Sequence, residues 1–367
     1  MIANFAKKSK DCYHKAMKKY IKEIEELASQ LKKPIKLMEV CGTHTQVVAE
    51  YGLKNFLPAN VELVSGPGCP VCVTGQRDID AVVELALAGA SIFCYGDMMR
   101  VPGTKMSLAE AAQRGARVRA VYSVSEIAAS SQAPPRNDKK GVFFGIGFET
   151  TAPMTASFVK RGGVVYSAHK SFAPAMQALL SSGEINIDGL ISPGHVAAIT
   201  GWRAFDVLRT FDGAQIPQVV AGFELEDVLR AIVMLLRQIV SGEAKTENEY
   251  IRVVLSEGNK KAQKLLREVF DLSEGYWRGL GSIPATGFEL KKEFAKQDAK
   301  VIYKDIIDKV FARKLAVKNK CLCGQVIKGL ISSEKCPMFC RECTPDTPQG
   351  PCMVSVEGSC YVKYSNR

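Results

Sequence analysis

Short apolar segments that alternate with helical stretches run through most of the chain and limit the folds open to it. Eight such segments occur, at residues 35–40, 61–65, 91–96, 117–123, 141–147, 163–168, 188–192 and 217–224. Each is followed by a Gly/Pro-rich or polar loop and then by a helical pattern, the longest at residues 224–240. Because parallel strands need crossover connections, which are usually helices, this order predicts an α/β fold with largely parallel sheets.

The eight segments fall into two sets of four, separated by the Pro- and charge-rich stretch 130–141, which has the composition of a linker. We therefore predict two similar α/β domains that face a cleft, at residues 36–135 and 136–241. Apolar residues at three- and four-residue steps predict an amphipathic helix at 4–32, which would act as a covering helix within residues 1–35. Residues 242–367 are expected to contain a helical segment in the second half of 253–270, a loop-like stretch at 276–290 and a small C-terminal module.

Twelve cysteines are distributed unevenly along the 367 residues. Five lie in the first hundred residues, none lies between Cys94 and Cys321, and seven follow from Cys321 onward. The N-terminus lacks the apolar core of a signal peptide and no stretch has the length of a membrane helix, so we expect a cytoplasmic chain. In a reducing compartment clustered thiols indicate metal binding or redox chemistry more than structural disulfides.

The net charge of +11 would allow an anionic partner, but the lysines are spread along the chain. Those of the N-terminal segment recur at helical spacing and are expected to form a solvated helix face, so we predict neither a nucleic-acid nor a membrane partner. The sequence has no phosphate-binding Gly-x4-Gly-Lys-Ser/Thr loop, no Gly-x-Ser-x-Gly elbow and no complete dinucleotide fingerprint. ATP, NAD and serine-hydrolase chemistry are therefore not supported.

Chemically capable side chains follow the predicted strands, where α/β proteins bind their ligands. If the two domains face each other, three thiols would line one side of the cleft and a carboxylate and a histidine the other. Cys69 and Cys72 lie within one turn of an exposed loop, the arrangement of a reactive pair or a chelate. The carboxylates could instead cap helices, and the histidines could be ligands, proton carriers or hydrogen-bonded strand-end residues. The candidates are Cys41, His44, Cys69, Cys72, Asp97, Glu149, His169 and His195.

The seven C-terminal cysteines begin with Cys-x-Cys, continue with Cys-x3-Cys-x2-Cys and end with two isolated residues. A zinc ribbon would need two close pairs about 15 to 20 residues apart, which this spacing does not supply. Iron-sulfur clusters accept four thiolates at irregular spacing, often beside prolines. The tail is therefore interpreted as a 4Fe-4S or 2Fe-2S module, with the excess thiols available for redox chemistry.

Six motifs together resemble the HypD family of nickel-iron hydrogenase maturation factors. They are CGTH at 41, SGPGCPVCVT at 65, FCYGDMMRVPG at 93, GIGFETTAP at 145, SPGHV at 192 and GPCMVSVEGSC at 350. The resemblance runs from about residue 36 to the C-terminus. It implies a scaffold that, in complex with the small chaperone HypC, holds an iron while two cyanides and one carbon monoxide are attached. Cyanide would come from HypE, as a thiocyanate made from carbamoyl groups supplied by HypF.

The resemblance also assigns residues. It places essential thiols at Cys41, Cys69 and Cys72, as the ligands of the mononuclear iron, and a 4Fe-4S cluster in the C-terminal module. The implied cluster ligands are Cys323, Cys336, Cys343 and Cys360, with Cys352 as the rival for any one of them. Cys340 stands where the family usually has glycine, and Cys321 is extra, so either could be a spare thiol.

A mechanism follows as a hypothesis: thiolates hold Fe(II), the dithiol Cys69/Cys72 supplies the two electrons that release cyanide from a thiocyanate, and the cluster resets the resulting disulfide. The protein would then be an assembly scaffold with redox-active thiols, not a conventional turnover enzyme. The main alternative is an iron-sulfur-dependent disulfide reductase acting on a protein partner, with no mononuclear iron. A zinc-stabilised binding module is the third.

Overall fold

The computed structural model describes residues 17–130, 141–210, 212–314 and 320–367. The first helix occupies residues 17–28, and the part of the expected helix before residue 17 lies outside the described residues, as does nearly all of the expected linker. The chain forms two compact units, each of which is described by itself. Unit 1 contains the described residues up to Gly68, together with Met176–Asn259 and Ser365–Arg367, and unit 2 contains Cys69–Ala175 and Lys260–Tyr364.

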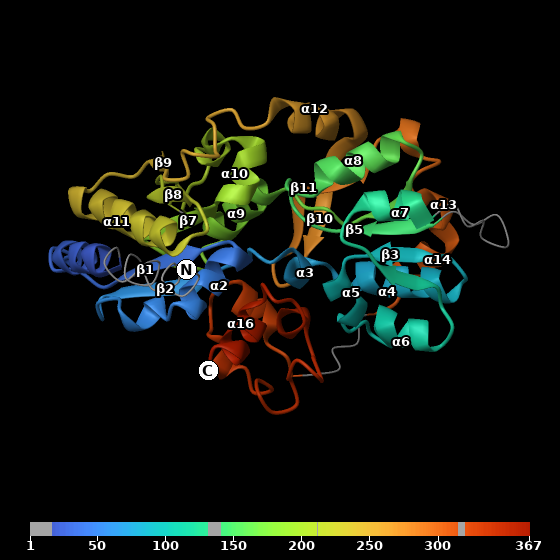
Figure 1. Ribbon diagram of the computed structural model, residues 1–367, viewed down its shortest axis with the longest axis horizontal. Coiled ribbons are helices and arrows are strands. Elements are labelled where there is room, and N and C mark those ends of the chain that lie inside the picture. The colour runs from blue at the N-terminus through green and yellow to red at the C-terminus, as the bar shows by residue number, and fades with distance from the viewer. Residues whose placement is uncertain (1–16, 131–140, 211, 315–319) are drawn as a thin grey trace, which may run out of the picture. The chain divides into compact units, whose positions relative to one another are not determined.

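Unit 1 is built on a five-stranded parallel sheet with the order β2-β1-β7-β8-β9. Its strands are β1 (Ile35–Glu39), β2 (Val61–Ser65), β7 (Gly189–Pro193), β8 (Gln218–Ala221) and β9 (Thr246–Asn248). Helices α2 (Gly42–Glu50), α10 (Gly194–Thr200) and α11 (Leu225–Ser241) follow β1, β7 and β8, as Figure 1 shows. The carboxyl ends of these strands therefore lead directly into helices, as the sequence predicts.

The core of unit 1 explains why the first helix and α11 form. In α11, buried apolar residues recur at Leu225, Val228, Leu229 and Ile232, which is the spacing of a helix with one face against a sheet. Ile24 of the first helix is completely buried in the same cluster, together with residues of α2 and of four strands. The described part of the expected covering helix therefore packs against the core of unit 1.

Unit 2 is built on a four-stranded parallel sheet with the order β4-β3-β5-β6. Its strands are β3 (Ile92–Cys94), β4 (Val118–Ala120), β5 (Val142–Gly145) and β6 (Val164–Ser167). Its helices include α3 (Pro70–Val73), α4 (Gln76–Leu87), α5 (Gly96–Arg100) and α12 (Lys260–Val269), and α9 (Phe172–Ser181) crosses the boundary between the units. The unit also contains α6 (Leu108–Gln113), α7 (Val124–Ser130), α8 (Ala152–Lys160), α13 (Ala299–Ile302) and α14 (Lys304–Phe311).

All eight predicted strands, α11 and α12 are present, which confirms the α/β class with parallel sheets. The predicted domain boundaries near residues 135 and 241 need correction, because the sheets do not follow chain order. β7 pairs with β1 and β5 pairs with β3, so each sheet combines strands from both halves of the sequence. Apolar runs identify strands, but the choice of neighbour depends on packing between distant segments, which the runs do not encode.

The stretch expected to be a loop at 276–290 is also a correction. It belongs to a long antiparallel hairpin of β10 (Phe270–Trp277) and β11 (Gly281–Leu290), with a register shift between Ser273 and Gly275. Glycine and proline within these strands conceal the usual alternation of a hairpin. β9 was likewise not among the predicted strands.

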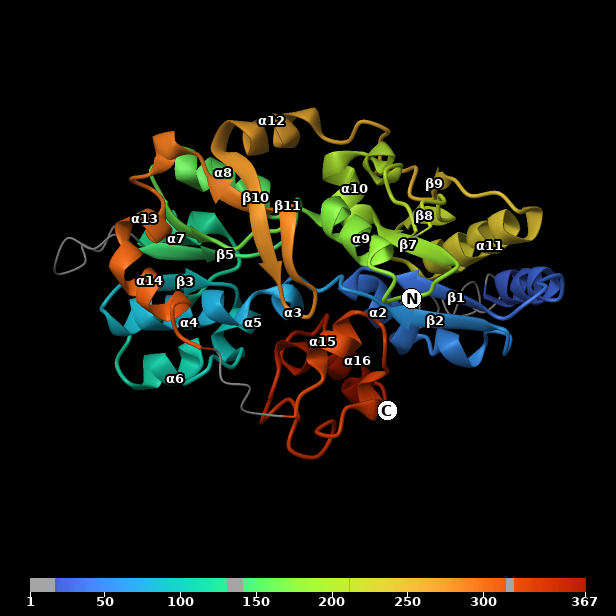
Figure 2. The ribbon, with the colours of Figure 1, turned by 180° about the vertical axis from the view of Figure 1, so that it is seen from behind.

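The C-terminal module follows residue 320 and contains only short helices (Figure 2). These are α15 (Cys323–Ile327), η4 (Ser333–Lys335), η5 (Pro351–Met353) and α16 (Ser359–Ser365). Buried cysteines take the place of a large aliphatic core, which confirms a small cysteine-rich module. Within the described residues, no helix is both long enough and apolar enough to span a membrane.

Candidate functional site

Cys41 lies at the start of α2 in unit 1, directly after β1, and is buried. Its backbone N–H donates to Oε2 of Glu39 at 3.2 Å, and the Thr45 hydroxyl donates to Oε1 of the same carboxyl at 2.5 Å. Gly68 packs so closely that a Cβ there would lie 2.3 Å from the Cys41 nitrogen. The Cys41 backbone is therefore fixed from two sides, by a buried carboxyl and by a glycine.

Glu39 is a residue that the sequence analysis missed. Burial raises the pKa of its carboxyl from 4.5 to about 7, and hydrogen bonds from Ser65, Thr45 and the Cys41 N–H only partly oppose this. The sequence signal for Glu39 was an acidic residue at the end of an otherwise apolar strand. If such a carboxyl is buried, hydrogen bonds must offset the free-energy cost of removing it from water. Near neutral pH this carboxyl can hold or release a proton beside Cys41.

We expect Glu39→Gln to remove a pH dependence of stability. The folded pKa of about 7 exceeds the ordinary value of 4.5, so the native state binds more protons between these values, and the stabilisation present at low pH is lost as pH rises through 7. Relative to the glutamine variant, the wild type should lose roughly 2–3 kcal/mol between about pH 5 and pH 8. Urea unfolding across this range measures the difference, and parallel pH profiles of the two proteins would contradict the assignment.

His44 and His195 both belong to unit 1 and stack on the same ring. Phe223 lies 4.9 Å from His44 and 3.7 Å from His195 between ring centroids, in nearly parallel arrangements. His44 is completely buried and its Nε2 lies 2.9 Å from the Gly222 carbonyl oxygen, so Nε2 carries the proton. Burial lowers the pKa of His44 to about 4, which keeps the ring neutral at pH 7.

The Nδ1 atom of His44 is buried and has no hydrogen-bond partner in the described part of the chain. A neutral imidazole with a free lone pair can accept a proton or bind a metal. His195 is more exposed than His44, and burial of part of its ring lowers its pKa. The loop that carries Gly222 and Phe223 is held in place, because Gly222 also donates its N–H to the Glu249 carboxyl at 3.2 Å.

Cys69 and Cys72 belong to unit 2 and form a disulfide, with their Cα atoms 5.2 Å apart. Cys69 is the N-cap of α3, and its sulfur accepts the Cys72 N–H at 3.2 Å. The sequence predicts that this loop is exposed, but the structure buries both residues, to 6% and 2% exposure. The reason is that α3 lies against η5 of the cysteine-rich module in the same unit.

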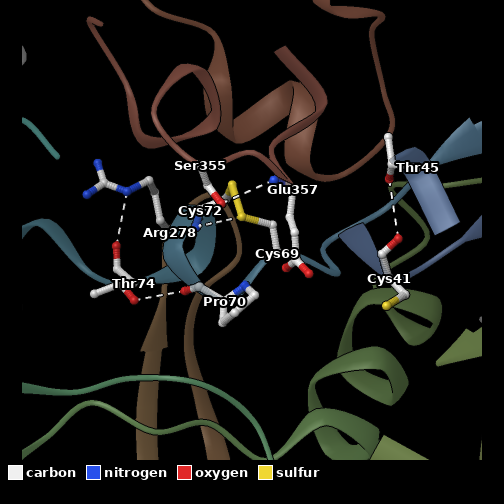
Figure 3. The surroundings of a disulfide bond; sticks show 9 residues. All are labelled: Cys41, Thr45, Cys69, Pro70, Cys72, Thr74, Arg278, Ser355 and Glu357. Atoms are coloured by element: carbon white, nitrogen blue, oxygen red, sulfur yellow. Dashed lines mark hydrogen bonds between the residues drawn. A yellow bond between two sulfur atoms is a disulfide. The ribbon is translucent and has the colours of Figure 1, made fainter. Parts of the chain in front are cut away.

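Figure 3 shows what surrounds this pair within unit 2. Ser355 and Glu357 of the cysteine-rich module and Arg278 of the hairpin are all drawn close to it. Arg100 of α5 donates to the Pro345 carbonyl, a further link between the α/β part of the unit and the module. The disulfide is therefore placed beside the module whose thiols could exchange electrons with it.

Two predicted site residues have structural partners in unit 2. Glu149 accepts hydrogen bonds from the Ser171 hydroxyl at 2.9 Å and the Phe172 N–H at 3.0 Å, so it caps the start of α9. His169 is buried, its Nε2 lies 2.8 Å from the Thr155 hydroxyl, and burial lowers its pKa to about 3. Asp97 lies half-buried in the first turn of α5.

The thiols of the C-terminal module approach one another. Hydrogen bonding with the Cys321 and Cys352 thiols lowers the pKa of Cys323 against the effect of burial, and the single proton of Cys352 can be donated to the sulfur of Cys323 or of Cys360. Burial raises the pKa of Cys343, and the nearby charges of Cys360 and Cys336 contribute in the same direction. The four implied cluster ligands and Cys352 are all buried, while Cys321 and Cys340 are half-buried. A group of soft, buried sulfur donors suits an iron-sulfur cluster.

Gly350 packs closely against two cysteines of the cysteine-rich module. A Cβ on Gly350 would lie 3.0 Å from the Cys321 sulfur and 3.5 Å from the Cys323 Cβ. The preceding Gln349 donates its N–H to the Cys343 sulfur at 3.4 Å. Within the described residues, no group of three or more His, Cys, Asp and Glu side chains is arranged to hold a single metal ion.

Cys340 has φ +57°, a left-handed conformation that favours glycine, which is the residue expected at this position. We expect Cys340→Gly to stabilise the protein by about 1 kcal/mol, because the Cβ strain is removed. Cys340→Ala is the matched control, since it removes the thiol but keeps the strain, and it should give no gain. Urea unfolding of the three proteins tests this, and equal stability of the glycine and alanine variants would contradict it.

Comparison with known proteins adds family information to this geometry. Residues 15–367 match the model of the family described as HypD, hydrogenase formation hypA family. The hydrogenase maturation factor HypD of Escherichia coli is 38% identical over 360 residues, which cover 95% of this chain and 94% of that protein. The HypD of Cupriavidus necator is 39% identical over 89% of this chain and 88% of its own length. A Methanocaldococcus jannaschii protein with a provisional name for hydrogenase expression and formation is 43% identical over 96% of this chain and 97% of its own.

Proposed function

Because the chain belongs to the HypD family, we propose that it is a scaffold for hydrogenase maturation. In complex with a HypC-type chaperone it holds an iron while two cyanides and one carbon monoxide are attached, giving the Fe(CN)2CO moiety of nickel-iron hydrogenase. A HypE-type protein delivers cyanide transiently as a thiocyanate. The main support for this proposal is that the buried Cys69–Cys72 pair lies beside a buried group of thiols in the same unit.

The dithiol supplies the electrons for cyanide release. In its reduced form, one thiolate of the pair attacks the sulfur of the donor's thiocyanate, a new S–S bond forms, and cyanide leaves with the electron pair of the broken S–C bond. The second thiolate then attacks the mixed disulfide and releases the donor's thiolate. The Cys69–Cys72 disulfide is the oxidised product of this sequence, and the iron receives the cyanide as a substrate.

Reopening the disulfide needs two electrons. A 4Fe-4S cluster supplies such electrons when bound, and Cys323, Cys336, Cys343 and Cys360 would hold it, with Cys352 as the rival ligand. The chain contributes the surroundings: the module lies against α3, and burial keeps external thiols away from the sulfurs. Since only thiolates bind metal, Cys69 and Cys72 can serve as iron ligands only after reduction.

The side chains around Cys41 have a separate task. The neutral His44 ring offers Nδ1 as a base or ligand, and Glu39 can hold a proton near neutral pH. These groups can take up the proton that a thiol loses when it binds iron. Exposed His195 stacks on the same Phe223 ring and can exchange protons with solvent. Glu149, as a helix cap, and half-buried Asp97 have positioning or proton-transfer roles in unit 2.

The test is metal and acid-labile sulfide analysis of anaerobically purified protein, with infrared spectra recorded after co-expression with the other maturation factors. The expected result is a cluster, one further iron, and bands of metal-bound cyanide and carbon monoxide. A cluster with no such bands, despite an intact complex with the chaperone, would favour a disulfide reductase. Equilibrium binding of Fe(II), lost in Cys41→Ala, separates the same two functions.

A further inference from the structure

The closed end of the β10–β11 hairpin contacts both α3, which carries the disulfide, and the cysteine-rich module of unit 2 (Figure 2). It consists of Trp277, Arg278 and Gly279, three consecutive residues that we call the hairpin tip. We propose that the hairpin tip is a clasp that holds α3 in place against the cysteine-rich module and shields the Cys69–Cys72 disulfide from external thiols. Arg278 is the positioning residue of this clasp. The clasp rests on the proposed function, because protecting the disulfide matters only if the pair has the proposed redox role.

Trp277 anchors the clasp. Its side chain is completely buried, and its ring stacks on Phe148 with centroids 5.6 Å apart and planes inclined by 14°. A large buried aromatic in the strand that leads into the tip fixes where the next two residues lie. The tip is therefore held by the core of unit 2 as well as by its bonds to α3.

Arg278 closes the carboxyl end of α3. Its backbone N–H donates to the Val73 carbonyl at 2.9 Å, and its Nε donates to the Thr74 carbonyl at 3.1 Å. Its Nη1 donates to the Gln76 side chain at 3.0 Å, at the start of α4. A helix of four residues leaves most of its carbonyls without intrahelical partners. The bonds from Arg278 supply hydrogen-bond donors that a longer helix would provide from its own backbone.

Gly279 makes the contact on the other side. It has φ +88°, and a Cβ there would lie 2.8 Å from the Cα of Gly324, the residue after Cys323. The two glycines therefore meet backbone to backbone, which no larger residue allows. One residue of the tip thus binds the disulfide helix and the next contacts the cysteine-rich module, so the tip sets how these two elements lie relative to each other.

The contacts of Arg278 depend on the planar shape of its guanidinium group as well as on its positive charge. Figure 3 shows the guanidinium group beside Thr74, joined to it by a hydrogen bond. Its planar fork reaches two acceptors at once, which a lysine ammonium cannot reproduce in the same arrangement. The comparison of methionine and lysine variants therefore separates a clasp from a simple charge effect.

The experiment measures how fast dithiothreitol reduces the oxidised pair in the full chain. Dithiothreitol gives up two electrons and two protons, closes to its cyclic disulfide, and leaves Cys69 and Cys72 as free thiols. Alkylation followed by mass spectrometry of the peptide that contains both residues reports their state separately from the other cysteines. Arg278→Met and Arg278→Lys are compared with Arg267→Met, which replaces an exposed arginine of α12 in the same unit.

We expect Arg278→Met to speed reduction by about tenfold, because α3 opens more often once the side-chain bonds of Arg278 to Thr74, at the end of α3, and to Gln76, at the start of α4, are lost. Arg278→Lys should show most of this increase, and Arg267→Met none. Amide hydrogen exchange of residues 69–76 should rise in the same two variants, which keeps the test valid if reduction is slow. Wild-type rates in both measurements, or an effect confined to the methionine variant, would overturn the clasp.

The two proposals can fail separately. Faster reduction in Arg278→Met, together with a wild-type chain that takes up no iron and shows no cyanide bands, would support the clasp and contradict the scaffold. Unchanged reduction in a chain that matures hydrogenase normally would overturn the clasp alone.

Discussion

Replacing Cys69 or Cys72 by serine should abolish hydrogenase maturation, while the fold and the iron content of the module stay unchanged. Either serine stops the reaction, because a single thiolate can form the mixed disulfide or resolve it but cannot do both. The double variant should be no worse than each single one, as expected for two groups that act as a unit. The measurement is hydrogenase activity in cells whose own factor has been replaced by each variant.

The expectation that the fold survives rests on the size of the disulfide loop. The two cysteines are three residues apart, so the bond restricts the unfolded chain little and is worth about 2 kcal/mol at most. Cys340→Ser is the matched control, since it removes a half-buried thiol of the same unit that is not one of the implied ligands. Unfolding of the Cys69 or Cys72 variants, or loss of the iron and acid-labile sulfide of the cysteine-rich module, would mean that these thiols are structural.

The strands could be predicted from the sequence because burial on both faces produces continuous apolar runs such as residues 142–145. Their arrangement in sheets could not, since β7 joins β1 across about 150 residues of chain and no local pattern specifies that pairing. The hairpin was missed for a related reason. Gly275 and Gly287 place backbone against backbone, so the segment lacks the side-chain alternation of a typical strand.

The candidate site was predictable to the extent that reactive residue types follow strands. Cys41, His44 and His195 lie where a parallel sheet exposes its carboxyl ends. Glu39 and Arg278 were not predicted, because their importance comes from what they contact and not from their spacing. A buried carboxyl beside Cys41 and an arginine that closes α3 both depend on tertiary packing, which a single sequence does not reveal.

The second large effect concerns the seven C-terminal cysteines, for which we predict two classes of behaviour. Serine at any of the four implied ligands should reduce iron and acid-labile sulfide from about four each per chain to below about one. Cys321→Ser and Cys340→Ser should keep the full content. The four ligands are Cys323, Cys336, Cys343 and Cys360, all of which are buried.

Cys352 decides between the two possible ligand sets. It is more deeply buried than the four implied ligands, and its neighbours include the sulfurs of both Cys323 and Cys360. As a non-ligand it would lie beside two ligand sulfurs and donate its single proton to one of them, and such a bond raises the reduction potential of a cluster. Cys352→Ser, which keeps a donor, should then retain its iron, and Cys352→Ala should retain iron with a lower potential. Loss of iron in both variants, with iron retained in a serine variant of one implied ligand, would instead make Cys352 the fourth ligand.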